Sequence, residues 1–176
     1  MEIIIIGVLL VALMVYVSTK IKKNAAKEFE PEAVEKEDFS LEKPAGFLYP
    51  LHDEPEFAFE AYSKDYGERG TRNIWRAKVR LRIFDDTTLK KHVDRIKSGA
   101  ESIDSRKQFD DLPEGQKGMI LRTNRTEDEI DYKVLRKLVE VVPENKIYEL
   151  KTTMLAPFAE VYTDRICEMM RSFVVK

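Results

Sequence analysis

The sequence is poor in the residues that most often carry catalysis or bind metals. Its 176 residues include one cysteine, Cys167, and two histidines, His52 and His92. A single cysteine excludes a disulfide within the chain and a metal centre built from cysteine pairs. Two histidines leave little material for a Ser-His-Asp or Cys-His arrangement. We therefore expect a protein that is not an enzyme and that binds no metal and no cofactor.

Glycine is also scarce, and its positions form no nucleotide-binding motif. The glycines closest to such a motif are Gly67, Gly70, Gly115 and Gly118. Their spacing differs from that of a phosphate-binding loop or a dinucleotide fingerprint. His52 lies beside Asp53 and Glu54, which we interpret as a solvated loop rather than a metal or acid–base cluster. Cys167 lies near the apolar stripe of a predicted helix, where a small buried thiol is the usual state. No motif in the sequence therefore indicates a reaction.

Charge is absent from residues 3–17, and this run is the most informative feature of the sequence. A helix over residues 3–19 would be about 25 Å long, slightly short of the hydrocarbon core of about 30 Å. Local thinning of the bilayer and lysine side chains that reach the headgroups make up the difference. The sequence therefore predicts a transmembrane anchor. Its apolar residues include Ile3, Ile6, Leu9, Leu10, Leu13 and Val17.

Two other interpretations of this run fit less well. A cleavable signal needs a basic region before the apolar run and a small-residue cleavage site after it, but the only charged side chain before the run is that of Glu2, and no such site follows. A buried helix of a soluble protein would keep a polar stripe. Lys20, Lys22 and Lys23 come directly after the run, and positive residues stay on the cytoplasmic side. We therefore expect a single-pass membrane protein with its N-terminus outside and its C-terminal domain in the cytoplasm.

Residues 24–44 differ in composition from the rest of the chain. They are rich in glutamate, contain Pro31 and show no sustained apolar period, which indicates an acidic spacer, either a frayed helix or a flexible stretch. The sequence thus predicts three parts: residues 1–23 as the anchor with its basic flank, residues 24–44 as the spacer, and residues 45–176 as one soluble domain.

Apolar periodicity within residues 45–176 predicts an α+β domain. Strands are expected at residues 56–62, 74–84, 118–123 and 146–152, with a brief helical turn after Ser105 and helices at residues 88–98, 126–142 and 157–173. Two adjacent strands that precede alternating helices and strands favour a mixed, mainly antiparallel sheet of about four strands. Because residues 74–84 alternate apolar and basic side chains, we expect three helices on one face and solvent on the other.

The basic face of residues 74–84 is the candidate binding site. It carries four cations at every second position, with a fifth close by: Arg76, Lys78, Arg80 and Arg82, and Arg72. Like charges about 6.5 Å apart repel, so an anion should compensate them. Glu56 and Glu60 on the preceding strand are the internal candidates. An acidic protein partner and an anionic lipid headgroup are the external ones. Nucleic acid is disfavoured because the net charge is −2 and no aromatic residues alternate with the cations.

Two functions remain open from the sequence. The first is a non-enzymatic accessory or assembly subunit of a membrane complex, whose cytoplasmic domain binds another protein. The second is a membrane-tethered domain that binds an anionic ligand or lipid headgroup through the basic face. The second predicts an exposed concavity beside Arg76, Arg80 and Arg82, whereas internal pairing predicts that Glu56 and Glu60 neutralise this face.

Overall fold

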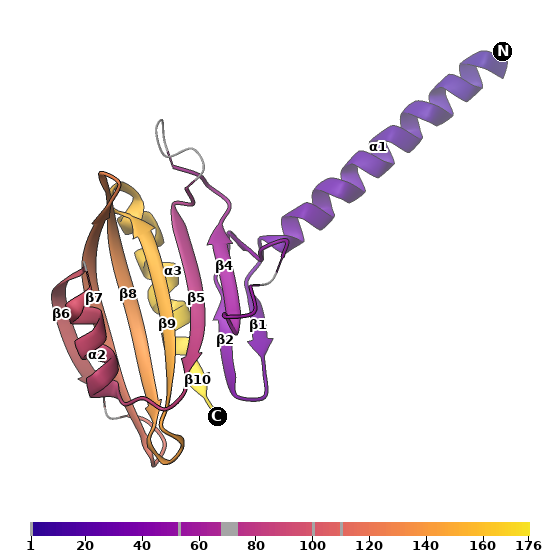
Figure 1. Ribbon diagram of the computed structural model, residues 1–176. Coiled ribbons are helices and arrows are strands. Elements are labelled where there is room, and N and C mark those ends of the chain that lie inside the picture. Colours follow the sequence, from indigo (N-terminus) through magenta and orange to yellow (C-terminus); the bar gives the residue numbers. More distant parts are fainter. Residues whose placement is uncertain (1, 53, 68–73, 100, 110) are drawn as a thin grey trace. The chain divides into compact units, whose positions relative to one another are not determined.

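The computed structural model describes residues 2–52, 54–67, 74–99, 101–109 and 111–176. The chain divides into two compact units, Met1–Glu30 and Pro31–Lys176. The first unit consists of helix α1 (Glu2–Glu28) (Figure 1). The second contains the strands that the structure describes, together with helices α2 and α3.

Helix α1 does not end where the apolar run ends. It continues past Val17 through Lys20, Lys22 and Lys23 to Glu28, and charged side chains are costly inside the hydrocarbon core. Among the residues that the structure describes, no helix combines the length and the apolar character needed to cross a membrane. The predictions of a transmembrane anchor, of its orientation by the lysines and of a single-pass membrane localisation are therefore wrong.

The main element of the second unit is a seven-stranded antiparallel sheet in the order β3-β4-β5-β9-β8-β7-β6. Its strands are β3 (Phe47–Leu48), β4 (Phe59–Ser63), β5 (Ala77–Phe84), β6 (Glu101–Phe109), β7 (Gln116–Glu127), β8 (Ile130–Val141) and β9 (Lys146–Leu155). Short 3-10 turns at Val142–Glu144 and Ala156–Phe158 flank β9. Because consecutive side chains point to opposite faces, the central strands supply two cores.

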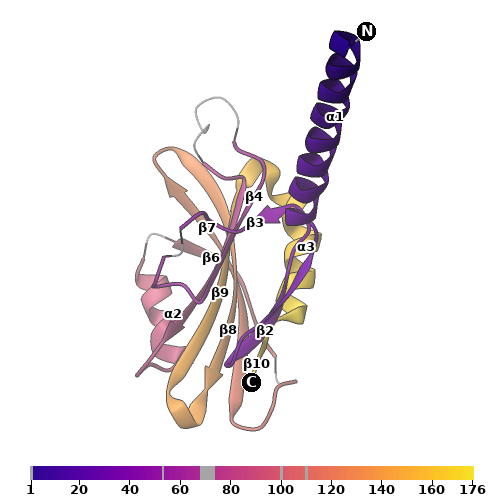
Figure 2. The same cartoon turned by 90° about the vertical axis from the view of Figure 1, so that its right-hand side faces the viewer.

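The two faces of this sheet are covered differently (Figure 2). One face packs against helix α3 (Ala159–Ser172) and a three-stranded sheet made of β1 (Glu32–Glu35), β2 (Phe39–Lys43) and β10 (Val174–Val175). The other face packs against helix α2 (Leu89–Ser98), whose Leu89 and Val93 contact a smaller core around Leu138 and Ile147. Helix α2 is short, so part of this second face stays open.

The α+β class is confirmed, but the predicted sheet and helix arrangement is wrong. Over its described residues the chain forms ten strands in two sheets rather than about four in one, and α2 and α3 lie on opposite faces. Residues 126–142, predicted as a helix, form the end of β7 and strand β8, joined by a two-residue turn at Asp128 and Glu129 with φ of 49° and 65°. Positive φ at both positions is typical of a tight hairpin turn. The region after Ser105, predicted as a helical turn, lies in β6.

The predicted spacer is largely folded. Strands β1 and β2 pair with each other and bury Val34, Phe39 and Leu41 in the core. The Phe39 ring lies 6.3 Å from the Phe173 ring, so this segment packs against the end of the chain. The compact unit therefore begins at Pro31 rather than at residue 45.

Gly118 provides a stability test of this sheet. It lies opposite Phe109 in the β6–β7 pair, and a methyl carbon added to it would overlap the Phe109 ring, with Cε1 at 2.7 Å. We expect Gly118→Ala to lower the free energy of unfolding by about 1–3 kcal/mol, because the ring must leave its position. Urea denaturation measures the change. Phe109→Ala combined with Gly118→Ala should cost less than the sum of the two single changes, and strict additivity would contradict the contact.

Candidate functional site

The open part of the α2-covered face forms a groove of about 620 Å³. Side chains from β5 and β9 line its floor, residues of α2 line one wall, and the start of β6 closes an end. Strand pairing places Arg80 of β5 opposite Lys151 of β9, and Lys151 opposite Arg136 of β8. Three cations on neighbouring strands therefore lie in one row across the groove, which we call the central row.

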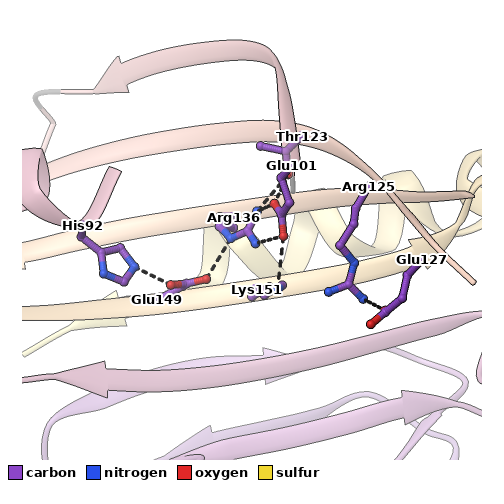
Figure 3. A network of polar contacts seen from close by, with 8 residues as sticks. All are labelled: His92, Glu101, Thr123, Arg125, Glu127, Arg136, Glu149 and Lys151. Atoms are coloured by element: carbon purple, nitrogen blue, oxygen red, sulfur yellow. Dashed lines mark hydrogen bonds and ion pairs between the residues drawn. The ribbon is translucent and has the colours of Figure 1, made fainter. Parts of the chain in front are cut away.

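A buried network of ion pairs holds one end of the central row (Figure 3). The Arg136 guanidinium, only 3% exposed, donates to both carboxylate oxygens of Glu101 at 2.6 and 2.7 Å. Its Nε donates to Glu149 Oε1 at 2.9 Å. His92 Nε2 of α2 lies 2.5 Å from the other oxygen of Glu149, and the Thr123 hydroxyl donates to Glu101 at 2.6 Å. Arg136 is thus fixed between two carboxylates from different strands.

The charges of this network stabilise one another. Burial by itself raises the pKa of Glu101, but hydrogen bonds from Arg136 and Thr123 outweigh it and lower this pKa to about 2. Burial likewise raises the pKa of Glu149, yet His92 and Arg136 lower it overall. Burial lowers the pKa of Arg136, and the two carboxylates raise it overall. Glu101, Glu149 and Arg136 therefore all remain charged near neutral pH.

Three of the predicted binding residues, Lys78, Arg80 and Arg82, line the groove and make ion pairs on its β4 side. Glu60 accepts from Lys78 at 2.6 Å and from Arg80 at 2.9 Å, and its pKa is lowered because these contacts outweigh burial. Arg82 lies 3.1 Å from Glu56. The structure thus contains both the expected pairing with Glu56 and Glu60 and a concavity beside the same cations.

The other predicted binding residues lie elsewhere or outside the described residues. The Arg76 guanidinium lies 4.0 Å from the centre of the Phe158 ring, and its Nε donates to the Tyr66 carbonyl. It does not line the groove. Arg72 falls outside the residues that the structure describes.

The predicted anchor and orientation residues all belong to α1, in the other unit. The side chains of Leu10, Leu13 and Val17 are exposed there, as are those of Lys20, Lys22 and Lys23. The side chains of Ile3, Ile6 and Leu9 lie outside what the structure describes.

The sequence did not reveal the residues that form the far side of the groove. Arg136 belongs to a segment predicted as a helix, and Glu149 and Lys151 lie on a correctly predicted strand without a recognised role. A usable signal was present in residues 146–152, where Glu149 and Lys151 alternate with apolar residues. His92 is buried against Glu149, whereas His52 is exposed and does not line the groove.

The chemistry available in the groove is that of fixed charges. Carboxylates hold most of its cations in defined geometry, and Phe57 and Phe84 supply apolar surface beside Arg80 and Arg82. Within the described ranges, no group of three or more histidine, cysteine, aspartate or glutamate residues is arranged to hold a metal ion. The groove is thus arranged to bind and orient a charged group.

The fold of the second unit is shared with proteins of known structure. Cyanobacterial PsbP (CyanoP) from Synechocystis sp. PCC 6803 superposes with a TM-score of 0.55 at 11% identity, over 84% of this chain and 94% of that one. LpqN of Mycobacterium tuberculosis, involved in cell envelope biogenesis, gives 0.60 at 11% identity, over 84% and 91%. The Ran-binding protein Mog1p of Saccharomyces cerevisiae gives 0.56 at 13% identity, over 84% and 96%.

These likenesses establish the fold and nothing finer, because identities of 11–13% are too low to transfer a site. No protein-family model matches the sequence, and no curated protein matches it.

Proposed function

We propose that this chain is a non-enzymatic accessory subunit that binds another protein through the groove. The observation that carries the proposal is the state of the β5 cations. Lys78 and Arg80 are anchored by the buried Glu60, yet their side chains remain 29% and 34% exposed at the floor of an open groove. Cations that are fixed and still accessible select a complementary partner without a large entropic cost of ordering.

Two further observations support a protein partner. Aromatic faces stand beside the charges of the groove, as is common at protein interfaces. Mog1p, which has the same fold, is a Ran-binding protein. Binding of a protein to this domain agrees with that use of the fold.

Crosslinking and subsequent affinity purification test the proposal. The full chain carrying Arg80→Gln and Arg82→Gln should recover each specific partner in an amount at least about tenfold lower than the wild type, since two charge-assisted contacts are removed. The matched control carries Arg106→Gln and Lys107→Gln, two exposed cations on the edge strand β6, and should keep its partners. Equal partner recovery with both variants would overturn the proposal.

A further inference from the structure

The charges in the middle of the groove do not balance. The central row and the residues that pair with it contain four cations and three buried or nearly buried carboxylates: Lys78, Arg80, Lys151 and Arg136, and Glu60, Glu101 and Glu149. Glu54 reaches Arg80 only at 3.6 Å from an exposed position at the rim, where pairing contributes little. One positive charge is therefore left without a close counter-charge among these residues.

The excess arises where Lys78 and Arg80 share Glu60, but Lys151 is the one of the four cations that donates no hydrogen bond to a carboxylate. Of the described carboxylates, the one within 4 Å of its Nζ is Glu101, at 3.7 Å, which is beyond hydrogen-bonding distance. Glu101 is already held by two hydrogen bonds from Arg136 and one from Thr123. Burial, and after it the neighbouring Arg136, lower the pKa of Lys151, as expected for an ammonium group without sufficient compensation.

An incoming anion would reach Lys151 and meet a second cation beside it. The Lys151 side chain is 29% exposed, and Arg80, directly opposite it on β5, is 34% exposed. Arg95 on the α2 wall is exposed, and no described carboxylate pairs with it. Lys151 thus lies between two other cations, Arg80 and Arg136, whereas Arg82 and Arg125 of the same groove are paired with Glu56 and Glu127.

The proposed function indicates the class of anion. A protein partner supplies a carboxylate through an aspartate or glutamate side chain, and a carboxylate carries one negative charge. Phe57, Phe84 and Ile96 line the same groove and offer apolar surface to neighbouring side chains. These two features together fit a peptide segment in which an acidic residue has apolar neighbours.

We infer that the partner inserts such an acidic segment into the groove and that Lys151, supported by Arg80, receives its carboxylate. This inference rests on the proposed function, since it names the chemistry of the partner at the same site. It adds a binding residue that the basic face of β5 alone does not contain.

Peptide binding to the full chain tests the inference. We would probe an array of decapeptides with a central glutamate, each paired with the same peptide carrying glutamine, and measure the best binders by fluorescence anisotropy. Glutamate peptides should bind at least about tenfold more tightly than their glutamine partners. Lys151→Gln should remove most of this preference, Lys151→Arg should keep it, and the matched control Lys107→Gln on β6 should leave it unchanged.

The outcomes separate this inference from the proposed function. Equal binding of glutamate and glutamine peptides, or an unchanged preference in Lys151→Gln, would overturn the acidic segment and the role of Lys151. Displacement of the peptide by inorganic phosphate or by anionic phospholipid vesicles at lower concentrations than by free glutamate peptide would overturn the choice of a carboxylate. The proposed function fails independently, if the Arg80→Gln and Arg82→Gln variant keeps its crosslinked partners.

Discussion

Replacing Arg136 by methionine is expected to lower the free energy of unfolding by about 3–5 kcal/mol. Arg136 is 3% exposed and is the shared partner of Glu101 and Glu149, whose own side chains are 10% exposed. Removal of the guanidinium leaves two carboxylates in a poorly solvated environment, where the remaining described polar partners are His92, Thr123 and Lys151. Urea denaturation, monitored by circular dichroism, gives the change.

Two further variants make this result specific. Arg136→Met combined with Glu101→Leu and Glu149→Leu also removes the two uncompensated carboxylates. This triple variant should recover much of the lost stability, because apolar replacement of a whole buried ion group is often tolerated. Arg82→Met breaks the exposed pair with Glu56, 46% and 48% exposed, and should change stability by no more than about 1 kcal/mol. A cost below about 1 kcal/mol for Arg136→Met would contradict the buried network.

The network also produces the charge distribution of the groove. Glu101 lies near both Arg136 and Lys151. Its carboxylate accepts two short hydrogen bonds from Arg136, whereas the Lys151 ammonium lies 3.7 Å away. Because the guanidinium binds a carboxylate through two parallel donors, it outcompetes an ammonium for the same group. A structural ion pair therefore leaves Lys151 available to an external anion.

Strand β5 shows what the sequence made predictable. Its apolar residues Ala77, Val79 and Leu81 are buried and its basic residues face the groove, so a period of two appears directly in the sequence. Glu56 and Glu60 were named as internal counter-charges of this basic face, and in the strand register Glu60 lies opposite Arg80. The positions of helices α2 and α3 were also predictable from the sequence, because each helix buries one face and its apolar residues therefore recur at helical spacing.

Strand β8 shows why the rest was not predictable. It is covered on both faces, so Val134, Leu135, Leu138 and Val139 are all buried, and their spacing resembles that of a helix. Thr126 and Glu129 also have the spacing of a helix capping box, although they lie at a hairpin turn. Strands β1 and β2 are only four and five residues long and carry exposed glutamates, too little pattern to identify.

The site itself depends on strand order. Glu101 and Arg136 are 35 residues apart in the sequence, and His92 and Glu149 are 57 apart. Glu101 and Arg136 meet because β7 pairs with both β6 and β8, and His92 meets Glu149 because α2 packs on the same face of the sheet as Glu149 of β9. Local sequence patterns contain no information on that order, so the groove could be found only from the structure.

Acidification is expected to destabilise the domain through Glu101. Its pKa is about 2 in the folded protein and 4.5 in an unperturbed chain, so the unfolded state takes up a proton first as the pH falls. The stabilisation is therefore fully present above about pH 4.5 and is lost as the pH falls toward 2. Between pH 6 and pH 2 we expect a loss of about 2–3 kcal/mol from this group, with allowance for partial solvent access.

Unfolding free energies from urea denaturation at a series of pH values measure this loss. The Glu101→Gln variant lacks the titrating group, so its stability should fall by about 2–3 kcal/mol less over the same range. In an Arg136→Met background the wild-type dependence should also shrink, because the guanidinium supplies the main hydrogen bonds that keep Glu101 ionised. Parallel pH profiles for the wild type and Glu101→Gln would show that Arg136 and Glu101 are not paired in solution. The same result would contradict the argument that Arg136 occupies the Glu101 carboxylate and so leaves Lys151 without a close counter-charge.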